Sequence, residues 1–263
     1  MAYQDIIYSV EEHIATVTLN RPETLNSFTT SMLDEWVDAI EAAKRDPKVR
    51  VLVVTGAGRG FCSGMNVRGA AGGGEQPPVY ARRNYMRLSV HRVPRALEGF
   101  DKPYIASING PAAGAGMDMA SMADIRIMSD KAKVGMNYVR VGLLPGDAGC
   151  YFLPRIVGIA KALELIWSGK MIDAEEALRI GYVSKVVPHD ELATATRELC
   201  LQFTQAPVAT QFAKRLVWRG IDMFRNINLE MAEMAMIINS TSPDTREGPK
   251  AWVEKREPQW TAE

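Results

Sequence analysis

Segments whose apolar residues have the spacing of β-strands alternate with segments that have the spacing of helices along the first half of the chain. IATVTLN (14–20) alternates apolar with polar positions and is rich in β-branched residues, which predicts a strand. VRVLVVTG (49–56) is apolar almost throughout, which predicts a fully buried strand. PYIASING (103–110) and ADIRIMS (123–129) predict two further strands.

Segments with helical spacing lie between these strands. The segment that follows residue 29 places its apolar side chains on one face, and Thr30 or Ser31 can cap this helix. Residues 79–98 are expected to be largely helical, and a short helix is expected around 114–122. Strands that alternate with helices place the chain in the α/β class.

The pattern changes after Pro207. VATQFAKRLVWRGIDM and NLEMAEMAMIINS carry apolar stripes at helical spacing, which predicts helices that contribute to a core or to a subunit interface. We therefore expect a core domain over residues 1–200 and a helical region over residues 201–263.

Composition narrows the class of protein. The 263 residues are 47% hydrophobic and 24% charged, with 31 basic and 31 acidic side chains, so neither nucleic acid nor another polyelectrolyte is an expected partner. We expect no signal peptide and no membrane span, because no basic start precedes an apolar run and no long uncharged apolar segment occurs. Three cysteines far apart indicate reduced thiols and a cytoplasmic protein, and three histidines without paired spacing argue against a metal.

Two glycine-rich segments could pass for phosphate loops. TGAGRGF (55–61) follows a strand but leads into no helix, and SGKM (168–171) lacks the upstream glycine and the Ser/Thr of a P-loop. Small residues also let a ligand approach main-chain N–H groups. GAGMD (114–118) opens a helix and SGMN (63–66) ends a loop, so two N–H sources for an oxyanion hole are available.

Five ordered segments of this chain resemble the crotonase family, the enoyl-CoA hydratase/isomerase superfamily. The second and third resemble its two oxyanion segments, and the match extends along nearly the whole chain. The segments are TLNRPETLNSF (18–28), VLVVTGAGRGFCSGMNV (51–67), KPYIASINGPAAGAGMDMASMADIRIMSDKAKVGM (102–136), VGLLPGDAGCYFLPRIVGIAKALELIWSGKMIDAEEALRIGYVSKVVP (141–188) and EGPKAWVEKREPQW (247–260).

The resemblance implies an α/β fold, a spiral of repeated ββα units, followed by a C-terminal helical trimerisation region over residues 201–263. It implies a coenzyme A thioester as substrate, no separate cofactor, and a homotrimer or a hexamer. The thioester oxygen would be held by the amides of Met65 and Ala115, beside Gly64 and Gly114, while an enolate forms.

The resemblance also suggests residues that contact the substrate or its coenzyme A. Arg68 would lie near the coenzyme A, although a solvated surface arginine is an equal alternative. Trp252 and Lys255 resemble positions on the last helix that help to close the coenzyme A site. His91 lies where some hydrolytic members carry a histidine, although packing is the commoner role for such a residue.

The chain departs from the family at the two acid/base positions. Hydration of an enoyl thioester needs one group that activates water at Cβ and one that delivers a proton to Cα. Usual hydratases carry two glutamates, whereas this chain has Asp118 and Tyr138. Tyrosine is a poor base at neutral pH but donates a hydrogen bond. Asp147, nine residues after Tyr138, is either the second carboxylate or a cap for the helix that begins near Ala148.

We therefore predict an enoyl-CoA hydratase in which Asp118 and Asp147 handle protons and Tyr138 shapes the pocket or donates a hydrogen bond. A double-bond isomerase is the close alternative, because one carboxylate can move a proton between two carbons. A hydrolase or dehalogenase of a cyclic or aromatic acyl-CoA would use His91 with Asp147. A non-catalytic acyl-CoA-binding protein is the remaining alternative.

Overall fold

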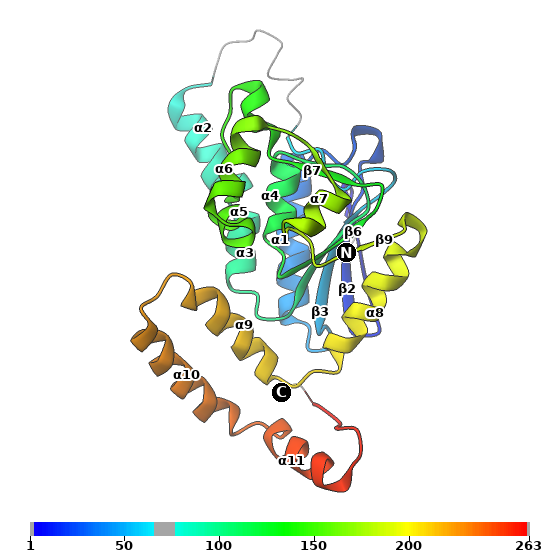
Figure 1. The fold of residues 1–263 in the computed structure, drawn as a ribbon, viewed down its shortest axis with the longest axis vertical. Helices are drawn as coiled ribbons and strands as arrows, with labels where there is room; N and C mark the ends of the chain where they lie inside the picture. The colour runs from blue at the N-terminus through cyan, green and yellow to red at the C-terminus, as the bar shows by residue number, and fades with distance from the viewer. Residues whose placement is uncertain (1–2, 66–76, 262–263) are drawn as a thin grey trace.

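The computed structural model describes residues 3–65 and 77–261. Its main sheet has six strands in the order β1-β2-β3-β4-β6-β9, with β1 and β2 antiparallel and all other neighbours parallel (Figure 1). The predicted strands are confirmed, with ends that differ by up to two residues. The strands are β1 Ile6–Glu11, β2 Ile14–Leu19, β3 Val51–Gly56, β4 Tyr104–Ile108, β6 Ile125–Ser129 and β9 Lys185–Val187.

Helices cover both faces of the sheet, which explains the nearly continuous apolar runs of its central strands. On one face, Val17 and Val54 belong to the main core cluster together with side chains of α1 (Thr30–Arg45). On the other face, Ile105 packs with Cys200 of α8 (Leu192–Thr204), which lies along the sheet in Figure 1.

The start of α1 differs from the prediction by one residue. Its N-cap is Thr29, whose side chain accepts a hydrogen bond from the amide of Met32 at 3.0 Å. Extended backbone at Thr29 directs the hydroxyl to the third amide of the helix, so neither Thr30 nor Ser31 is the cap.

The remaining elements of the core follow the predicted alternation. A small three-stranded sheet in the order β5-β7-β8 supports the loops that surround α4. Residues 79–98 are helical as predicted, in three consecutive segments. These elements are η1 Pro22–Thr24, α2 Val79–Tyr85, η3 Met86–Val90, α3 Arg92–Glu98, β5 Ala112–Ala113, α4 Ala115–Ser121, β7 Lys133–Gly135, η4 Asn137–Val141, α5 Gly149–Val157, α6 Ile159–Ser168, β8 Ile172–Asp173, α7 Ala174–Arg179 and η5 His189–Glu191.

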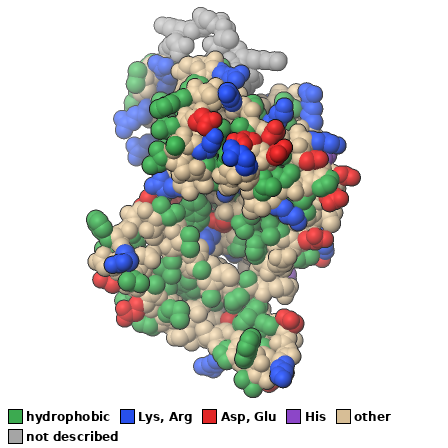
Figure 2. All heavy atoms as spheres, viewed as in Figure 1, with side chains coloured by type: hydrophobic (Ala, Val, Ile, Leu, Met, Phe, Trp, Pro, Cys, Tyr) green, Lys and Arg blue, Asp and Glu red, His purple; other side chains and the backbone are tan. Residues whose placement is uncertain are grey.

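Three C-terminal helices extend from the core, coloured orange to red in Figure 1: α9 (Ala209–Gly220), α10 (Arg225–Asn239) and α11 (Asp244–Glu254). None of the described helices is long and apolar enough to cross a membrane. Figure 2 shows apolar side chains spread over the lower part of the molecule, where these helices lie. The large apolar side chains exposed over more than half of their surface here are Val217, Phe224, Leu229, Met234, Met236, Ile237, Ile238, Trp252 and Val253.

Candidate active site

Asp118 lies in the short helix α4, directly behind the glycine-rich turn. Gly114, with φ +53°, lets the chain turn from β5 into this helix, and its carbonyl accepts a hydrogen bond from the Asp118 amide at 3.1 Å. The Asp118 side chain is fully buried. Burial disfavours the carboxylate and raises the pKa of Asp118 to about 7, although hydrogen bonds from Tyr138 and the Asp147 amide oppose this rise.

Tyr138 connects Asp118 with Asp147. Its hydroxyl donates to Oδ2 of Asp118 at 2.6 Å and also lies 3.2 Å from Oδ2 of Asp147. The amide of Asp147 donates to Oδ2 of Asp118 at 3.3 Å. The three polar groups come from α4, from η4 and from the loop before α5, and the structure brings them into one cluster as the prediction required.

The three side chains of this cluster have more hydrogen-bond acceptor oxygens than protons to share among them. Burial and the two neighbouring carboxylates raise the pKa of Tyr138, so the phenol keeps its single proton. Burial likewise raises the pKa of Asp147. The single phenol proton can donate a full hydrogen bond to only one of the two carboxylates at a time. The arrangement therefore favours a further proton on one of the two aspartates at neutral pH.

Asp147 is not a helix cap, so that alternative is wrong. Helix α5 begins at Gly149 after Ala148, which has φ +75°, and no side chain caps it. The loop before it is held by His91 instead, whose Nε2 lies 2.8 Å from the carbonyl oxygen of Gly146. Because a carbonyl only accepts, Nε2 carries the proton of this hydrogen bond. Positive charge on His91 would also lower the pKa of Asp147, against the larger effect of burial.

The two segments expected to form an oxyanion hole are in direct contact. The amide of Ala113 donates to the carbonyl of Cys62 at 3.0 Å. A Cβ atom at Gly64, which has φ +80°, would lie 3.1 Å from the amide nitrogen of Ala115. Within the part of the chain that the structure describes, the amides of Met65 and Ala115 donate no hydrogen bond to the protein.

A glycine that the sequence did not single out shapes the space around Asp118. A Cβ atom at Gly149 would lie 1.9 Å from Oδ1 of Asp118. Glycine is therefore needed for the carboxylate to fit against the start of α5. No local motif indicates this contact, because the two residues belong to different helices.

Other predicted residues are not joined to this cluster. Trp252 is 84% exposed on α11, which lies at the opposite end of the molecule from α2 and well away from α4 (Figure 1). Lys255 directly follows the same helix. Arg68 lies outside the described residues. Cys150, in the first turn of α5, is exposed.

We expect Asp118→Asn to raise the free energy of unfolding at pH 8. The folded-state pKa of Asp118, about 7, exceeds its unfolded value near 3.9, so ionisation costs folded-state stability as pH rises between these values. A neutral asparagine avoids this cost, so the gain should be about 3–4 kcal/mol at pH 8, about 1–2 kcal/mol at pH 5, and near zero only below about pH 4. Urea unfolding at one protein concentration measures it. The exposed Asp190→Asn is the control, and an equal gain at both pH values would contradict the explanation.

We expect Tyr138→Phe to move the pH dependence of catalysis upward. The Tyr138 hydroxyl stabilises the Asp118 carboxylate and lowers its pKa, so its removal raises that pKa further. The inflection that reports ionisation of Asp118 in kcat/KM should therefore shift to higher pH by about one unit. The half-buried Tyr8→Phe serves as control, and an unmoved inflection in Tyr138→Phe would show that the hydrogen bond does not act on the titrating group.

Comparison with known proteins agrees with this architecture. The family model described as "Enoyl-CoA hydratase/isomerase" matches residues 9–263. Crotonyl-CoA hydratase of Syntrophomonas wolfei is 33% identical over 260 residues, with 97% of each chain covered. 1,2-Epoxyphenylacetyl-CoA isomerase of Escherichia coli is 34% identical over 266 residues, covering 97% of this chain and 98% of the relative.

Solved structures lead to the same assignment. Enoyl-CoA hydratase from Bacillus anthracis superposes with a TM-score of 0.92 at 30% identity, covering 99% of this chain and 100% of the other. The chain belongs to the enoyl-CoA hydratase/isomerase family, and the predicted family and α/β crotonase fold are confirmed.

Proposed function

We propose that this protein hydrates the conjugated double bond of an enoyl-CoA by way of a thioester enolate. The observation that carries the proposal is the pair of buried carboxylates, Asp118 and Asp147, joined through Tyr138 near two backbone amides that donate no hydrogen bond among the described residues. The relative from S. wolfei named crotonyl-CoA hydratase supports the same reaction.

The two amides would act on the thioester carbonyl. The N–H groups of Met65 and Ala115 would donate to its oxygen and stabilise negative charge as the enolate forms. Each such donor is typically worth about two to three orders of magnitude in rate. Because α4 begins at Ala115, the amide of Ala115 lies at the N-terminal end of the helix, where the peptide dipoles place partial positive charge.

The two carboxylates would exchange the protons. One carboxylate accepts a proton from water while the water oxygen bonds to Cβ and the C=C electron pair moves toward Cα and the carbonyl. The other carboxylic acid then gives its proton to Cα, which regenerates the thioester. Asp118, with a pKa of about 7, is poised for either step at neutral pH. Tyr138, hydrogen-bonded to both carboxylates, favours opposite protonation states for them.

Double-bond isomerisation is the second candidate, and the full burial of Asp118 favours it. A buried carboxylate can take a proton from one carbon and return it two carbons away without a water molecule. The relative from E. coli named an isomerase supports this alternative. The hydrolase alternative would have to use Nδ1 of His91 as the general base, because Nε2 donates its proton to the Gly146 carbonyl.

Product analysis separates these reactions. The purified protein is given a trans-2-enoyl-CoA and, separately, a trans-3-enoyl-CoA, and both ultraviolet absorbance and product mass are followed. Hydration predicts loss of the conjugated absorbance and addition of one water to the 2-enoyl substrate. Isomerisation predicts a rise in absorbance with the 3-enoyl substrate and no change in mass. No change with either substrate would refute both candidates.

The proposal extends to assembly and surroundings. We propose that α9–α11 form the trimerisation region, which would cover exposed apolar side chains such as Phe224 and Met236. The other expectations stay predictions: the trimer or hexamer, the cytoplasmic location, the absence of a separate cofactor, and the roles of Arg68, Trp252 and Lys255.

A further inference from the structure

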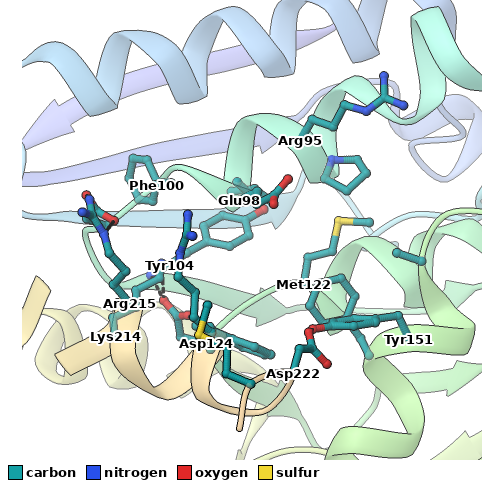
Figure 3. A pocket seen from close by; sticks show the side chains of 18 residues that line it. Arg95, Glu98, Phe100, Tyr104, Met122, Asp124, Tyr151, Lys214, Arg215 and Asp222 are labelled. Atoms are coloured by element: carbon teal, nitrogen blue, oxygen red, sulfur yellow. Dashed lines mark hydrogen bonds and ion pairs between the residues drawn. The ribbon is translucent and has the colours of Figure 1, made fainter. Parts of the chain in front are cut away.

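A cavity of about 490 Å³ lies between α3, α5 and α9, outside the aspartate cluster. Figure 3 shows Lys214 and Arg215 of α9 on one side, Tyr151 of α5 on the opposite side, and Tyr104 and Met122 between them. The volume falls within the usual range of small-molecule sites and is about three times that of a cavity that admits benzene. We call this space the distal chamber.

Two residues that line the distal chamber lie close in sequence to the two aspartates, which are not themselves part of its lining. Met122, which lines it, lies four residues after Asp118, so the two side chains are on the same side of the chain about one helical turn apart. Ala148, which also lines it, directly follows Asp147. A substrate whose reacting carbons lie beside these aspartates would therefore point its far end toward the chamber.

Aromatic side chains form much of the chamber wall. The rings of Phe152 and Trp218 meet edge to face with centroids 5.6 Å apart, and those of Tyr151 and Phe152 do so at 5.1 Å. Tyr104 is almost completely buried at the chamber wall. Such a wall favours an apolar alkyl or aryl group.

Four charged side chains of the wall form ion pairs with one another. Lys214 forms an ion pair with Asp124 at 2.8 Å, and Arg215 pairs with Asp101. The indole N–H of Trp218 donates to the other oxygen of Asp124 at 2.7 Å. These contacts satisfy the polar groups and also hold α9 over the chamber.

The far rim is closed by a second set of contacts. Asp222, just after α9, accepts hydrogen bonds from Tyr151 and from Arg155, the latter at 2.7 Å. The Arg155 guanidinium also stacks 3.6 Å from the centroid of the Tyr151 ring. These contacts and those of Lys214 and Arg215 hold α9 against the core on both sides of the chamber. The position of α9, and with it the depth of the chamber, is therefore fixed.

We propose that the distal chamber binds the apolar end of a medium-chain or aryl-substituted acyl group, and so sets the substrate class. This inference rests on the proposed acyl-CoA function. Four residues of helix rise about 6 Å, and an extended chain advances roughly 1.2 Å per bond, so about five bonds separate the carbon beside Asp118 from Met122. If that carbon is Cβ, the chamber receives the acyl chain from about its eighth carbon.

The test is the affinity of saturated acyl-CoAs, which cannot be hydrated, measured by calorimetry for hexanoyl-, octanoyl- and decanoyl-CoA. Each buried carbon contributes roughly a fourfold factor, so the three carbons at and beyond the eighth should make decanoyl-CoA about 50-fold tighter than hexanoyl-CoA. Two variants fill the chamber from opposite walls: Met223→Trp after α9 and Leu97→Trp on α3. Each should reduce the ratio to under about fivefold.

The control is Leu178→Trp on α7, an exposed position outside the chamber lining, which should keep the 50-fold ratio. Equal affinity for hexanoyl- and decanoyl-CoA in the unmodified protein would overturn the proposal, as would filled variants that keep the full ratio. The experiment distinguishes failure of the chamber proposal from failure of the proposed reaction. Chain-length-dependent binding without turnover of any enoyl-CoA would refute the proposed function and leave the chamber proposal standing.

Discussion

Asp118→Asn is expected to lower kcat for enoyl-CoA hydration by about 10²–10⁴-fold, the usual contribution of a general acid or base. Asparagine has nearly the shape of aspartate, and its carbonyl oxygen can still accept the hydrogen bond from Tyr138. It cannot take up or deliver a proton. The loss should therefore appear in kcat, with KM changed far less, because the amides of Met65 and Ala115 are intact.

Steady-state rates at pH 7 and pH 8 measure this effect beside the control Asp190→Asn. Because Asp118→Asn is also expected to raise stability at pH 8, loss of activity would coincide with a gain in unfolding free energy. That combination separates a catalytic role from simple misfolding. A variant that keeps more than a third of the rate would show that Asp118 is only a buried helix carboxylate.

Gly64→Ala is expected to reduce kcat by about 10²–10³-fold, since the new methyl group disturbs one donor of the oxyanion hole. At φ +80° the added Cβ would lie 2.8 Å from the carbonyl oxygen of Ala113 and 3.1 Å from the amide nitrogen of Ala115. The two segments would have to separate, and the left-handed backbone would add a cost of about 1–3 kcal/mol to folding.

Gly158→Ala is the matched control for this experiment. Gly158 has the same φ of +80°, but a Cβ atom there meets nothing within 4 Å. Both variants should lose stability from backbone strain, Gly64→Ala more than Gly158→Ala because of its close contacts, and only Gly64→Ala should lose activity. Equal loss of kcat in both variants would mean that strain alone explains the effect.

The sequence predicted the parts of the site that follow from local pattern. Strand and helix periods placed the two glycine-rich segments at strand ends, and the family resemblance identified Asp118, Tyr138 and Asp147 as candidate site residues. Their contact through one hydroxyl depends on the path of η4 and the following loop, which spacing does not determine. The cap alternative for Asp147 was wrong for the same reason, because the left-handed Ala148 directs the chain away from capping geometry.

Contacts between segments that lie far apart in the chain could not be predicted from the sequence. The fit of Gly149 against Asp118 joins residues 31 positions apart, and the hydrogen bond from His91 to Gly146 spans 55 positions. The distal chamber depends on α9 returning to the core, where Trp218 reaches Asp124 across 94 positions. None of these pairs has a local signature, since each depends on how complete elements pack.

The most direct test of the two-aspartate account compares Asp118→Asn, Asp147→Asn and the double variant in hydration of a trans-2-enoyl-CoA. If the carboxylates act as one unit through Tyr138, each single variant should lose at least about 10²-fold in kcat, and the double variant should be little worse than the slower single variant. Wild-type rates in Asp147→Asn, or losses that multiply in the double variant, would contradict the account.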